Sequence, residues 1–345
     1  MNPDPRCADA GPDQAWTLTG PDGLQIRLLA HGAAWVGCRV PLPDGSRREV
    51  LLGFDDLASQ RANRAYVGAV VGRYANRIAG RMLRRDGQAW PLACAAGANH
   101  QLHGGPGGFH QRDWSLLERG DSHLLLGLHS ADGDQGYPGA LDVQVGYALL
   151  PGLAVEVSFS ATLGGDQPCP VGLTQHAYFQ LDGAGGAHGA RVGDVRRQRL
   201  RVAASQVLPV DGSGLPSAAP QPVDGTPFDL RRLRAPGQAL DHAYLLEAAA
   251  ARGERPAAEL WSEDGRLGLA LSATLPALQV YTGNFLGPDT AACTPAWPDH
   301  GGIALEPQYL PDSPHHPEWP QPDCWLAPGA TWRQRFVYRF VPGPV

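Results

Sequence analysis

The chain contains no lysine, because all 28 of its basic residues are arginine. This absence excludes enzymes that form a Schiff base between a lysine amine and a carbonyl group. It also excludes a P-loop nucleotide site, whose motif includes a lysine that reaches the phosphates. Pyridoxal enzymes, lysine-dependent aldolases and P-loop NTPases are therefore ruled out before any other motif is considered.

Charged residues and long apolar runs are also scarce. Charged residues make up 18% of the chain and the formal net charge is -6, which disfavours nucleic acid and anionic membranes as partners. No apolar run approaches the roughly 18 residues of a membrane-spanning helix, and the first residues lack the basic and apolar regions of a signal peptide. Six cysteines without C-x-x-C spacing are expected to be free thiols. We expect a cytoplasmic protein.

Helical periodicity is nearly missing, whereas alternating apolar and polar residues recur between turns rich in glycine and proline. This pattern is typical of an all-β chain. We predict a large antiparallel β-sandwich, formed as a single domain by residues 1–345 with a frayed terminus at 1–14, and one short helix at 248–252. The expected strands are 24–27, 34–40, 124–129, 141–149, 153–159, 200–204, 259–262, 267–272 and 331–340.

The stretch 302–312, G-I-A-L-E-P-Q-Y-L-P-D, predicts a short buried strand that presents one carboxylate. Ile303 and Leu305 fall on one face by alternation, and Glu306 falls on the other. Pro307 cannot donate a ladder hydrogen bond, so we expect the strand to end or to become an edge near Glu306. A carboxylate there is costly unless it is paired, hydrogen-bonded or used in chemistry. The alternative is a structural glutamate held by local N–H groups.

Arg73 and Arg77 are expected on the same side of an extended segment. A guanidinium fork suits sugar hydroxyls or a carboxylate, although two surface arginines are the simpler interpretation of this motif alone. Farther along, His100 and His103 precede a glycine-rich loop, and with His110 they could ligate a metal. No carboxylate or cysteine stands at matching spacing, so we favour a hydrogen-bonding histidine and expect no metal.

His176 stands between Thr174 and Tyr178 in what we expect to be one strand with these three side chains on one face. An imidazole titrates near neutrality, so His176 is a candidate general acid or base. The alternative is a core histidine bonded to a carbonyl. Asp241 at an expected strand start and Gln279 on an alternating strand offer acceptors and donors for hydroxyl groups.

Motifs for other kinds of chemistry are missing. There is no G-x-S-x-G nucleophile motif, and no G-x-G-x-x-G stands on a strand–turn–helix. What remains is an acid, a base and several groups that bind hydroxyls. Chemistry that runs on these alone is proton transfer without a cofactor.

Taken together, these segments resemble those of the aldose 1-epimerases, and more narrowly of the bacterial galactose mutarotases. The resemblance covers roughly residues 15–340, and its runs stand in the family's order. The runs are G-R-Y-A-N-R-I (72–78), L-H-G-G (102–105), D-G-D-Q-G-Y-P-G (132–139), T-Q-H-A-Y-F (174–179), G-T-P-F-D (225–229), L-D-H (240–242), Q-V-Y-T-G-N-F (279–285), and L-E (305–306) with P-D-S-P-H-H-P-E-W-P (311–320).

The resemblance implies a galactose mutarotase-like supersandwich with no metal or cofactor, acting as a monomer or homodimer on free sugars such as galactose and glucose. It implies that Glu306 is the general base at the C1 hydroxyl and His176 the general acid at the ring oxygen, with roles exchanged on reclosure. A base must not be trapped in a tight ion pair, so we expect Glu306 in a partly apolar pocket. The residues matched to sugar-holding positions are Arg77, His103, Asp241 and Gln279.

The chain departs from the family's pattern around His176. Gly172, Gln175 and Gln180 stand where members commonly have asparagine. The longer glutamine side chains are expected to shift how His176 is oriented. The loop around His100 is one residue longer than usual, so only His103 is matched, through its two glycine neighbours.

Two other functions are compatible with the same fold. A hexose-6-phosphate mutarotase would need a basic pocket, for which Arg81, Arg84 and Arg85 are near the right stretch, but these arginines fit better as a hairpin around an Asp-Gly turn. A catalytically silent sugar-binding protein would be expected to lose Glu306 or His176, and the chain has both. We therefore favour the aldose 1-epimerase function.

Overall fold

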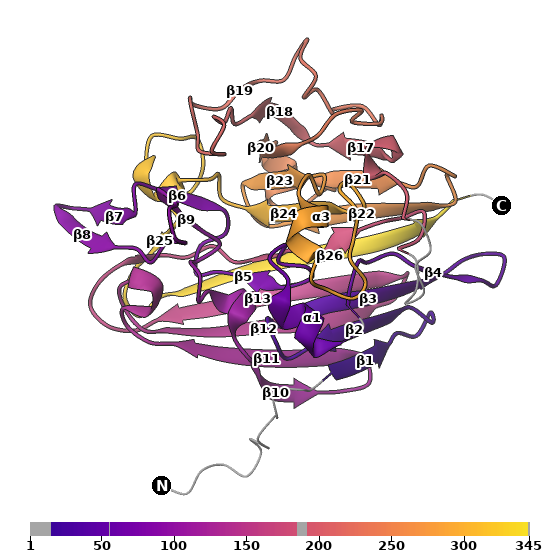
Figure 1. Ribbon diagram of the computed structural model, residues 1–345, viewed down its shortest axis with the longest axis horizontal. Coiled ribbons are helices and arrows are strands. Elements are labelled where there is room, and N and C mark those ends of the chain that lie inside the picture. The colour runs from indigo at the N-terminus through magenta and orange to yellow at the C-terminus, as the bar shows by residue number, and fades with distance from the viewer. Residues whose placement is uncertain (1–14, 55, 185–191, 344–345) are drawn as a thin grey trace, which may run out of the picture.

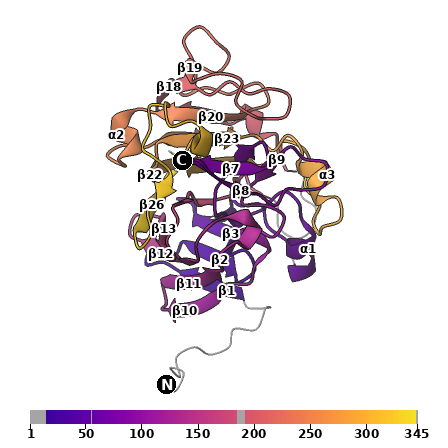
Figure 2. The same ribbon diagram turned by 90° about the vertical axis from the view of Figure 1, so that its left-hand side faces the viewer.

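The computed structural model describes residues 15–54, 56–184 and 192–343. Strands dominate, and antiparallel sheets stack in layers (Figures 1 and 2). The predicted frayed terminus lies outside the described residues. Within those ranges no helix is long and apolar enough to cross a membrane, and the cysteines that they contain are free, as predicted.

The largest sheet has eight strands, and its long strands bury every second residue, as β12 does throughout its length. One face of this sheet therefore packs on the core. In spatial order its strands are β10 (Ser115–Arg119), β11 (His123–Ser130), β12 (Leu141–Leu150), β13 (Ala154–Leu163), β26 (Thr331–Pro342), β22 (Leu267–Ala273), β21 (Ala258–Trp261) and β17 (Arg199–Val202).

A six-stranded sheet carries the predicted base on its second strand, which is buried along its whole length. In spatial order its strands are β16 (Tyr178–Phe179), β24 (Ile303–Gln308), β23 (Ala277–Tyr281), β20 (Asp241–Leu246), β18 (Ala204–Val207) and β19 (Gln221–Pro222).

The remaining strands form one four-stranded sheet and several two-stranded pairs, and the helices are short. The four-stranded sheet comprises β1 (Ala15–Thr19), β2 (Gln25–Leu29), β3 (Ala34–Pro41) and β4 (Arg47–Glu49). The pairs are β5 (Val70–Val71) with β15 (Thr174–Gln175), β6 (Arg77–Ala79) with β9 (His100–Leu102), β7 (Met82–Arg85) with β8 (Gln88–Pro91), and β14 (Cys169–Pro170) with β25 (Trp325–Leu326). The helices are α1 (Leu57–Ala62), α2 (Ala248–Ala251) and α3 (Leu286–Thr290), and the 3-10 turns are η1 (Phe109–Gln111), η2 (Asp134–Gly136), η3 (Val195–Arg197) and η4 (Ser313–His315).

Three sheets meet in one aromatic cluster beneath the six-stranded sheet. Trp35 of β3 lies edge-on to Phe179 of β16 and Tyr338 of β26, with ring centroids 5.9 and 5.3 Å apart, and Phe179 and Tyr338 are 5.5 Å apart. All three side chains are buried. Their packing fixes β16 relative to the large sheet, so the segment just before β16 is anchored in the core.

Most of the predicted strands and the short helix at 248–252 are present, with small differences at their ends. The predicted strand 200–204 is divided between the end of β17 and the start of β18, and the strand expected through His176 is divided into β15 and β16. Helices α1 and α3 were not predicted, because six and five residues are too few to show a helical period. Helix α1 nevertheless carries an N-cap, since the Asp56 carboxylate accepts a hydrogen bond from the Ser59 N–H at 2.6 Å.

The expectation for Pro307 is correct on one side of the strand only. Strand β24 continues through Pro307, which stands opposite Leu278 of β23. On its other side, β16 pairs only with Ile303 and Ala304. From Leu305 onward β24 therefore has one neighbour, and the missing N–H of proline is tolerated there.

Arg73 is neither a surface residue nor a partner of Arg77, contrary to the expectation from their spacing. It is buried, and its guanidinium donates to five oxygens of the segment 130–139, among them the carbonyls of Ala131 and Gly139, each at 2.7 Å. Arg73 therefore fixes the loop that follows β11.

We predict that Arg73→Met lowers the free energy of unfolding by about 3 kcal/mol or more, because several buried carbonyls lose their donor. Urea unfolding followed by circular dichroism measures this change. The exposed Arg119→Met serves as the control, with an expected change within about 0.5 kcal/mol. Equal stability of the two variants would contradict the structural role of Arg73.

Candidate active site

Three of the predicted site residues form a row across the six-stranded sheet. Glu306 of β24 stands opposite Gln279 of β23, and Gln279 stands opposite Ala243, two residues after Asp241 on β20. Side chains at these positions point to one face. Gln279 Nε2 donates to Asp241 Oδ1 at 2.6 Å, so the sheet register sets the spacing of the whole row.

The sequence predicted that His176 lies within one strand. In the structure it lies instead in the short connection between β15 and β16. Its backbone is held on both sides, because its N–H donates to the Ala69 carbonyl and its carbonyl accepts from the Gly68 N–H, both at 2.9 Å. The ring is buried, and Nε2 lies 3.5 Å from Glu306 Oε1. A carboxyl and an imidazole are thus paired away from bulk water.

His103 and Asn76 hold each other in place. Both adopt left-handed backbone conformations, with φ of 51° and 64°. The His103 N–H donates to the Asn76 carbonyl at 3.0 Å, and the Asn76 N–H donates to His103 Nδ1 at 3.2 Å. The His103 ring centroid then lies 5.3 Å from that of His176. Left-handed conformations cost energy outside glycine, so their presence at two site residues fits a functional constraint.

Arg77 completes the set of predicted residues at the beginning of β6. Its Nη2 is 3.9 Å from Asp241 Oδ2, and its side chain is 18% exposed. Gly214, in the segment between β18 and β19, packs directly on the guanidinium: a Cβ there would lie 2.6 Å from Arg77 Cζ. Sequence analysis missed Gly214, because nothing in the local pattern connects it to Arg77.

Several polar atoms of these residues are buried and lack a hydrogen-bond partner among the described residues. They are Glu306 Oε2, His176 Nδ1, Gln279 Oε1 and Arg77 Nε. Buried polar atoms without partners are rare in folded proteins. Such a cluster fits a site that receives a ligand rich in hydroxyl groups.

Gly172, Gln175 and Gln180 stand where family members commonly have asparagine. Among the described residues, none of the three forms a hydrogen bond with the His176 ring. The Gln175 amide receives a hydrogen bond from Tyr147 Oη at 2.9 Å. Gln180 donates to the carbonyls of Gly193 and Gly301. A Cβ on Gly172 would lie 3.0 Å from the Tyr309 ring. Gln175 also donates to the carbonyl of Gly68, whose N–H holds the His176 carbonyl, so its link to His176 runs through the backbone of Gly68 and not through the imidazole ring.

Two tyrosines enclose the imidazoles: Tyr66, which the sequence analysis did not select, and Tyr178, which it placed on the same face as His176. Tyr66, with φ of 57°, packs its ring 4.6 Å from His103, 4.6 Å from His110 and 5.7 Å from His176, measured between centroids. Tyr178 lies 4.9 Å from His176. The left-handed backbone conformation of Tyr66 can be recognised only in the structure, because no sequence pattern indicates it.

Burial dominates the electrostatics of the pair. It raises the pKa of Glu306 well above its ordinary value, with Asp241 adding to the rise and Arg77 opposing it. Together, burial, a backbone hydrogen bond that opposes the shift and the nearby His110 lower the pKa of His176 to about 3, with burial as the largest cause. Both shifts favour uncharged side chains. In the empty site, burial therefore favours a protonated, uncharged carboxyl beside an uncharged imidazole.

Three side chains of this site lie close enough together to ligate a metal ion, but the hydrogen bonding of His103 does not fit a metal ligand. The ligand atoms of His103, His176 and Glu306 lie within 4.8 Å of one another. However, His103 Nδ1 accepts from the Asn76 N–H, so the proton of this neutral ring is on the other nitrogen. A metal-bound histidine instead donates from its second nitrogen, so the set does not suit a resident metal.

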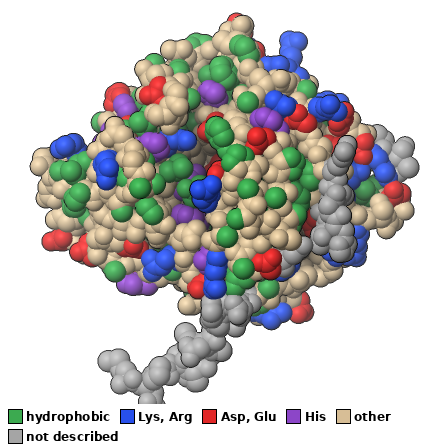
Figure 3. Space-filling view, viewed as in Figure 1, with side chains coloured by type: hydrophobic (Ala, Val, Ile, Leu, Met, Phe, Trp, Pro, Cys, Tyr) green, Lys and Arg blue, Asp and Glu red, His purple; other side chains and the backbone are tan. Residues whose placement is uncertain are grey.

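Two of the site residues reach the protein surface, because the side chains of Arg77 and Asp241 are 18% and 31% exposed. In the space-filling view, histidine and arginine side chains gather around a hollow near the middle of this face (Figure 3). The site therefore combines a buried carboxyl–imidazole pair with two partly exposed charged side chains.

Comparisons with known proteins identify the family of this chain. The family model for aldose 1-epimerase matches residues 14–339. An aldose 1-epimerase of Escherichia coli K12 is 41% identical over 354 aligned positions and covers 99% of each chain. A galactose mutarotase of Rattus norvegicus is 34% identical, with 92% of each chain covered.

The chain belongs to the aldose 1-epimerase family. Solved structures also show its fold: an aldose epimerase homologue from C. elegans superposes with a TM-score of 0.84 at 25% identity, covering 96% of this chain and all of the other. A galactose 1-epimerase from Lactobacillus acidophilus gives 0.77, also at 25% identity, covering 95% of this chain and 94% of the other. As a family member the protein is a mutarotase, an enzyme that interconverts the two anomers of an aldose.

We predict a flat pH profile for this aldose 1-epimerase in mildly acidic solution. A histidine of lowered pKa stays uncharged, and a carboxyl of raised pKa keeps its proton, so the state with one proton extends below the ordinary imidazole pKa. We expect kcat/KM by polarimetry to change less than about twofold between about pH 7 and pH 5. A titration of activity centred near the ordinary value of about 6.5 would contradict this prediction.

We further predict that Gly214→Ala raises the KM for the sugar, because the added methyl group displaces the Arg77 guanidinium. The loss of a charged hydrogen bond corresponds to about tenfold in kcat/KM. Gly225→Ala is the matched control, since its φ of 68° carries the same backbone strain but no atom lies within 4 Å of the new Cβ. If both variants lose activity equally, backbone strain rather than Arg77 is responsible.

Proposed function

We propose that Glu306 and His176 are the acid–base pair that interconverts the anomers of free hexoses such as galactose and glucose. The observation that carries this proposal is the 3.5 Å separation of Glu306 Oε1 and His176 Nε2 in a buried position. Two groups that each gain and lose a proton can open and close a hemiacetal ring without a cofactor.

In the proposed reaction Glu306 takes the proton of the C1 hydroxyl while His176 protonates the ring oxygen. The C1–O5 bond breaks and leaves a free aldehyde at C1. Rotation about C1–C2 then presents the other face of the aldehyde, and attack by the O5 hydroxyl re-forms the ring with the two residues in exchanged roles. No net proton is gained or lost.

Burial makes the opened state accessible. Ring opening starts with ionised Glu306 and protonated His176, and it leaves both side chains uncharged. A site with little water stabilises the uncharged pair, while the sugar's C1 hydroxyl, by donating to Glu306, favours the charged form before reaction. The two forms are thereby brought closer in free energy, which suits a reaction that must run equally in both directions.

Four further residues are proposed to hold the sugar rather than to react. Arg77 and His103 offer donors, and the linked Asp241 and Gln279 offer an acceptor and an amide on the same face as Glu306. A sugar hydroxyl that lies between Arg77 and Asp241 would accept a hydrogen bond from the guanidinium and donate one to the carboxylate. The two charged groups thereby set the orientation of this hydroxyl.

The phosphorylated-sugar alternative is less well supported. Arg84 and Arg85 lie on the β7–β8 hairpin, as the Asp-Gly turn predicted. Arg85 is engaged with Asp323 at 2.9 Å and with the ring of Trp325. We propose a neutral hexose as substrate, and we propose that the protein works in the cytoplasm as a single-domain monomer or homodimer.

Polarimetry of freshly dissolved α-D-galactose and α-D-glucose tests the proposal. The wild type should accelerate the approach to the anomeric equilibrium, and Glu306→Gln and His176→Asn should each reduce kcat by about 10²- to 10⁴-fold, because each removes one proton-transfer group. The ratio of the two sugar rates gives the preference.

The chain provides a matched control in an exposed pair of the same two side chains. His123 Nε2 and Glu118 Oε1 are 3.0 Å apart at the surface, and His123→Asn and Glu118→Gln should leave the rate unchanged. Full activity in either variant of the buried pair would overturn the assigned roles. Activity on glucose 6-phosphate alone would instead favour the phosphorylated substrate.

A further inference from the structure

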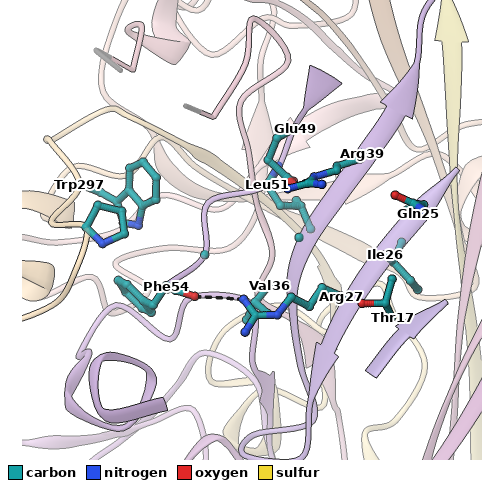
Figure 4. Close-up of a pocket in the computed structure, with 13 residues that line it drawn as sticks. Thr17, Gln25, Ile26, Arg27, Val36, Arg39, Glu49, Leu51, Phe54 and Trp297 are labelled. Carbon is teal, nitrogen blue, oxygen red and sulfur yellow. Dashed lines mark hydrogen bonds and ion pairs between the residues drawn. The ribbon is translucent and has the colours of Figure 1, made fainter. Parts of the chain in front are cut away.

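A second cavity lies between the four-stranded sheet and the segment that follows α3. Its volume is about 290 Å³, at the lower end of the range for small-molecule sites. Figure 4 shows the 13 residues that line it, and none of them belongs to the catalytic or sugar-holding set described above. The cavity therefore needs an explanation of its own.

One wall of this cavity is aromatic. In Figure 4, Trp297 and Phe54 lie on one side, and residues of β2 and β3 lie on the other. Trp297 is buried, and its Nε1 has no hydrogen-bond partner among the described residues. A flat apolar ring with a nearby polar edge suits a ligand that has both a C–H face and hydroxyl groups.

The opposite side supplies a carboxylate with a free oxygen. Glu49 Oε1 accepts from the N–H groups of Cys38 and Leu51, at 2.5 and 3.2 Å. Glu49 Oε2 is 3.7 Å from the Arg39 guanidinium, which is too long for a hydrogen bond. One oxygen is thus fixed by the backbone, and the other is available to accept from a ligand.

Arg27 supplies donors at the same cavity. Among the described residues, its guanidinium makes one hydrogen bond, a long one of 3.4 Å from Nη1 to the Phe54 carbonyl, drawn in Figure 4. Most of its N–H groups are therefore available. A carboxylate acceptor and a guanidinium donor at one cavity match the paired hydroxyls of a sugar.

We propose that this cavity is a second, non-catalytic binding site for a neutral aldose. The Glu49 carboxylate offsets one of the two arginine charges at the cavity, and its open oxygen can only accept a hydrogen bond, which suits a hydroxyl group rather than the oxygens of a phosphate. The aromatic wall receives the C–H face of the ring, and Glu49 and Arg27 bind its hydroxyls. This site goes beyond the family's activity and does not depend on the roles assigned to Glu306 and His176.

Equilibrium dialysis with radiolabelled D-galactose at millimolar concentrations tests the proposal on the full chain. The enzyme does not consume its sugar, so binding can be counted directly with the wild type. We expect two sugars per chain for the wild type, and one for Arg27→Met. We also expect one for Gly37→Leu, whose side chain would enter the cavity from β3, where a Cβ meets only Arg27 and Glu49 atoms at 3.3 Å and beyond.

Mutarotation of galactose by both variants should equal that of the wild type, which shows that they are folded. Arg47→Met, an exposed arginine of β4 outside the cavity, is the control and should keep two sugars. One sugar per chain in the wild type overturns the proposal, as do two sugars in both cavity variants. A second site filled by galactose 1-phosphate but not by galactose overturns the assignment of a neutral ligand.

Discussion

The structure depends on keeping one carboxyl and one imidazole together out of water. Glu306 and His176 are both buried and 3.5 Å apart. Burial opposes charge on either group, so their pKa values move in opposite directions and the pair favours an uncharged carboxyl beside an uncharged imidazole. A pair with this property can serve as acid or base toward the same substrate, which reversible anomer exchange requires.

Each part of the scaffold contributes to holding this pair. The β23–β24 register sets Glu306 beside Gln279, and the aromatic cluster of Trp35, Phe179 and Tyr338 anchors the strand that follows His176. Two backbone hydrogen bonds then fix His176 itself. The acid and the base thus come from segments about 130 positions apart, and only sheet packing brings them into contact.

Sequence reasoning predicted the β-rich fold and the strands, because period-two alternation and turn residues are local signals. It also selected Glu306, since a carboxylate in an apolar run is costly. It misplaced Arg73, whose partners lie more than 50 positions away, and it missed Gly214 and Tyr66. These roles depend on long-range packing and on backbone conformation, so no local pattern could have indicated them. The family resemblance, rather than periodicity, supplied the roles of Asp241 and Gln279.

The most direct test of the uncharged pair is ¹⁵N NMR of the His176 ring in the free enzyme. The His176 signal is assigned by its disappearance from the spectrum of His176→Asn. We predict an uncharged imidazole at about pH 7 that remains uncharged at about pH 5, because burial lowers its pKa far below the ordinary value. Protonation of His176 with a midpoint near the ordinary value of about 6.5 would contradict the account. Such a result would mean that Glu306 and His176 form an ordinary ion pair, and that burial does not keep the two side chains uncharged.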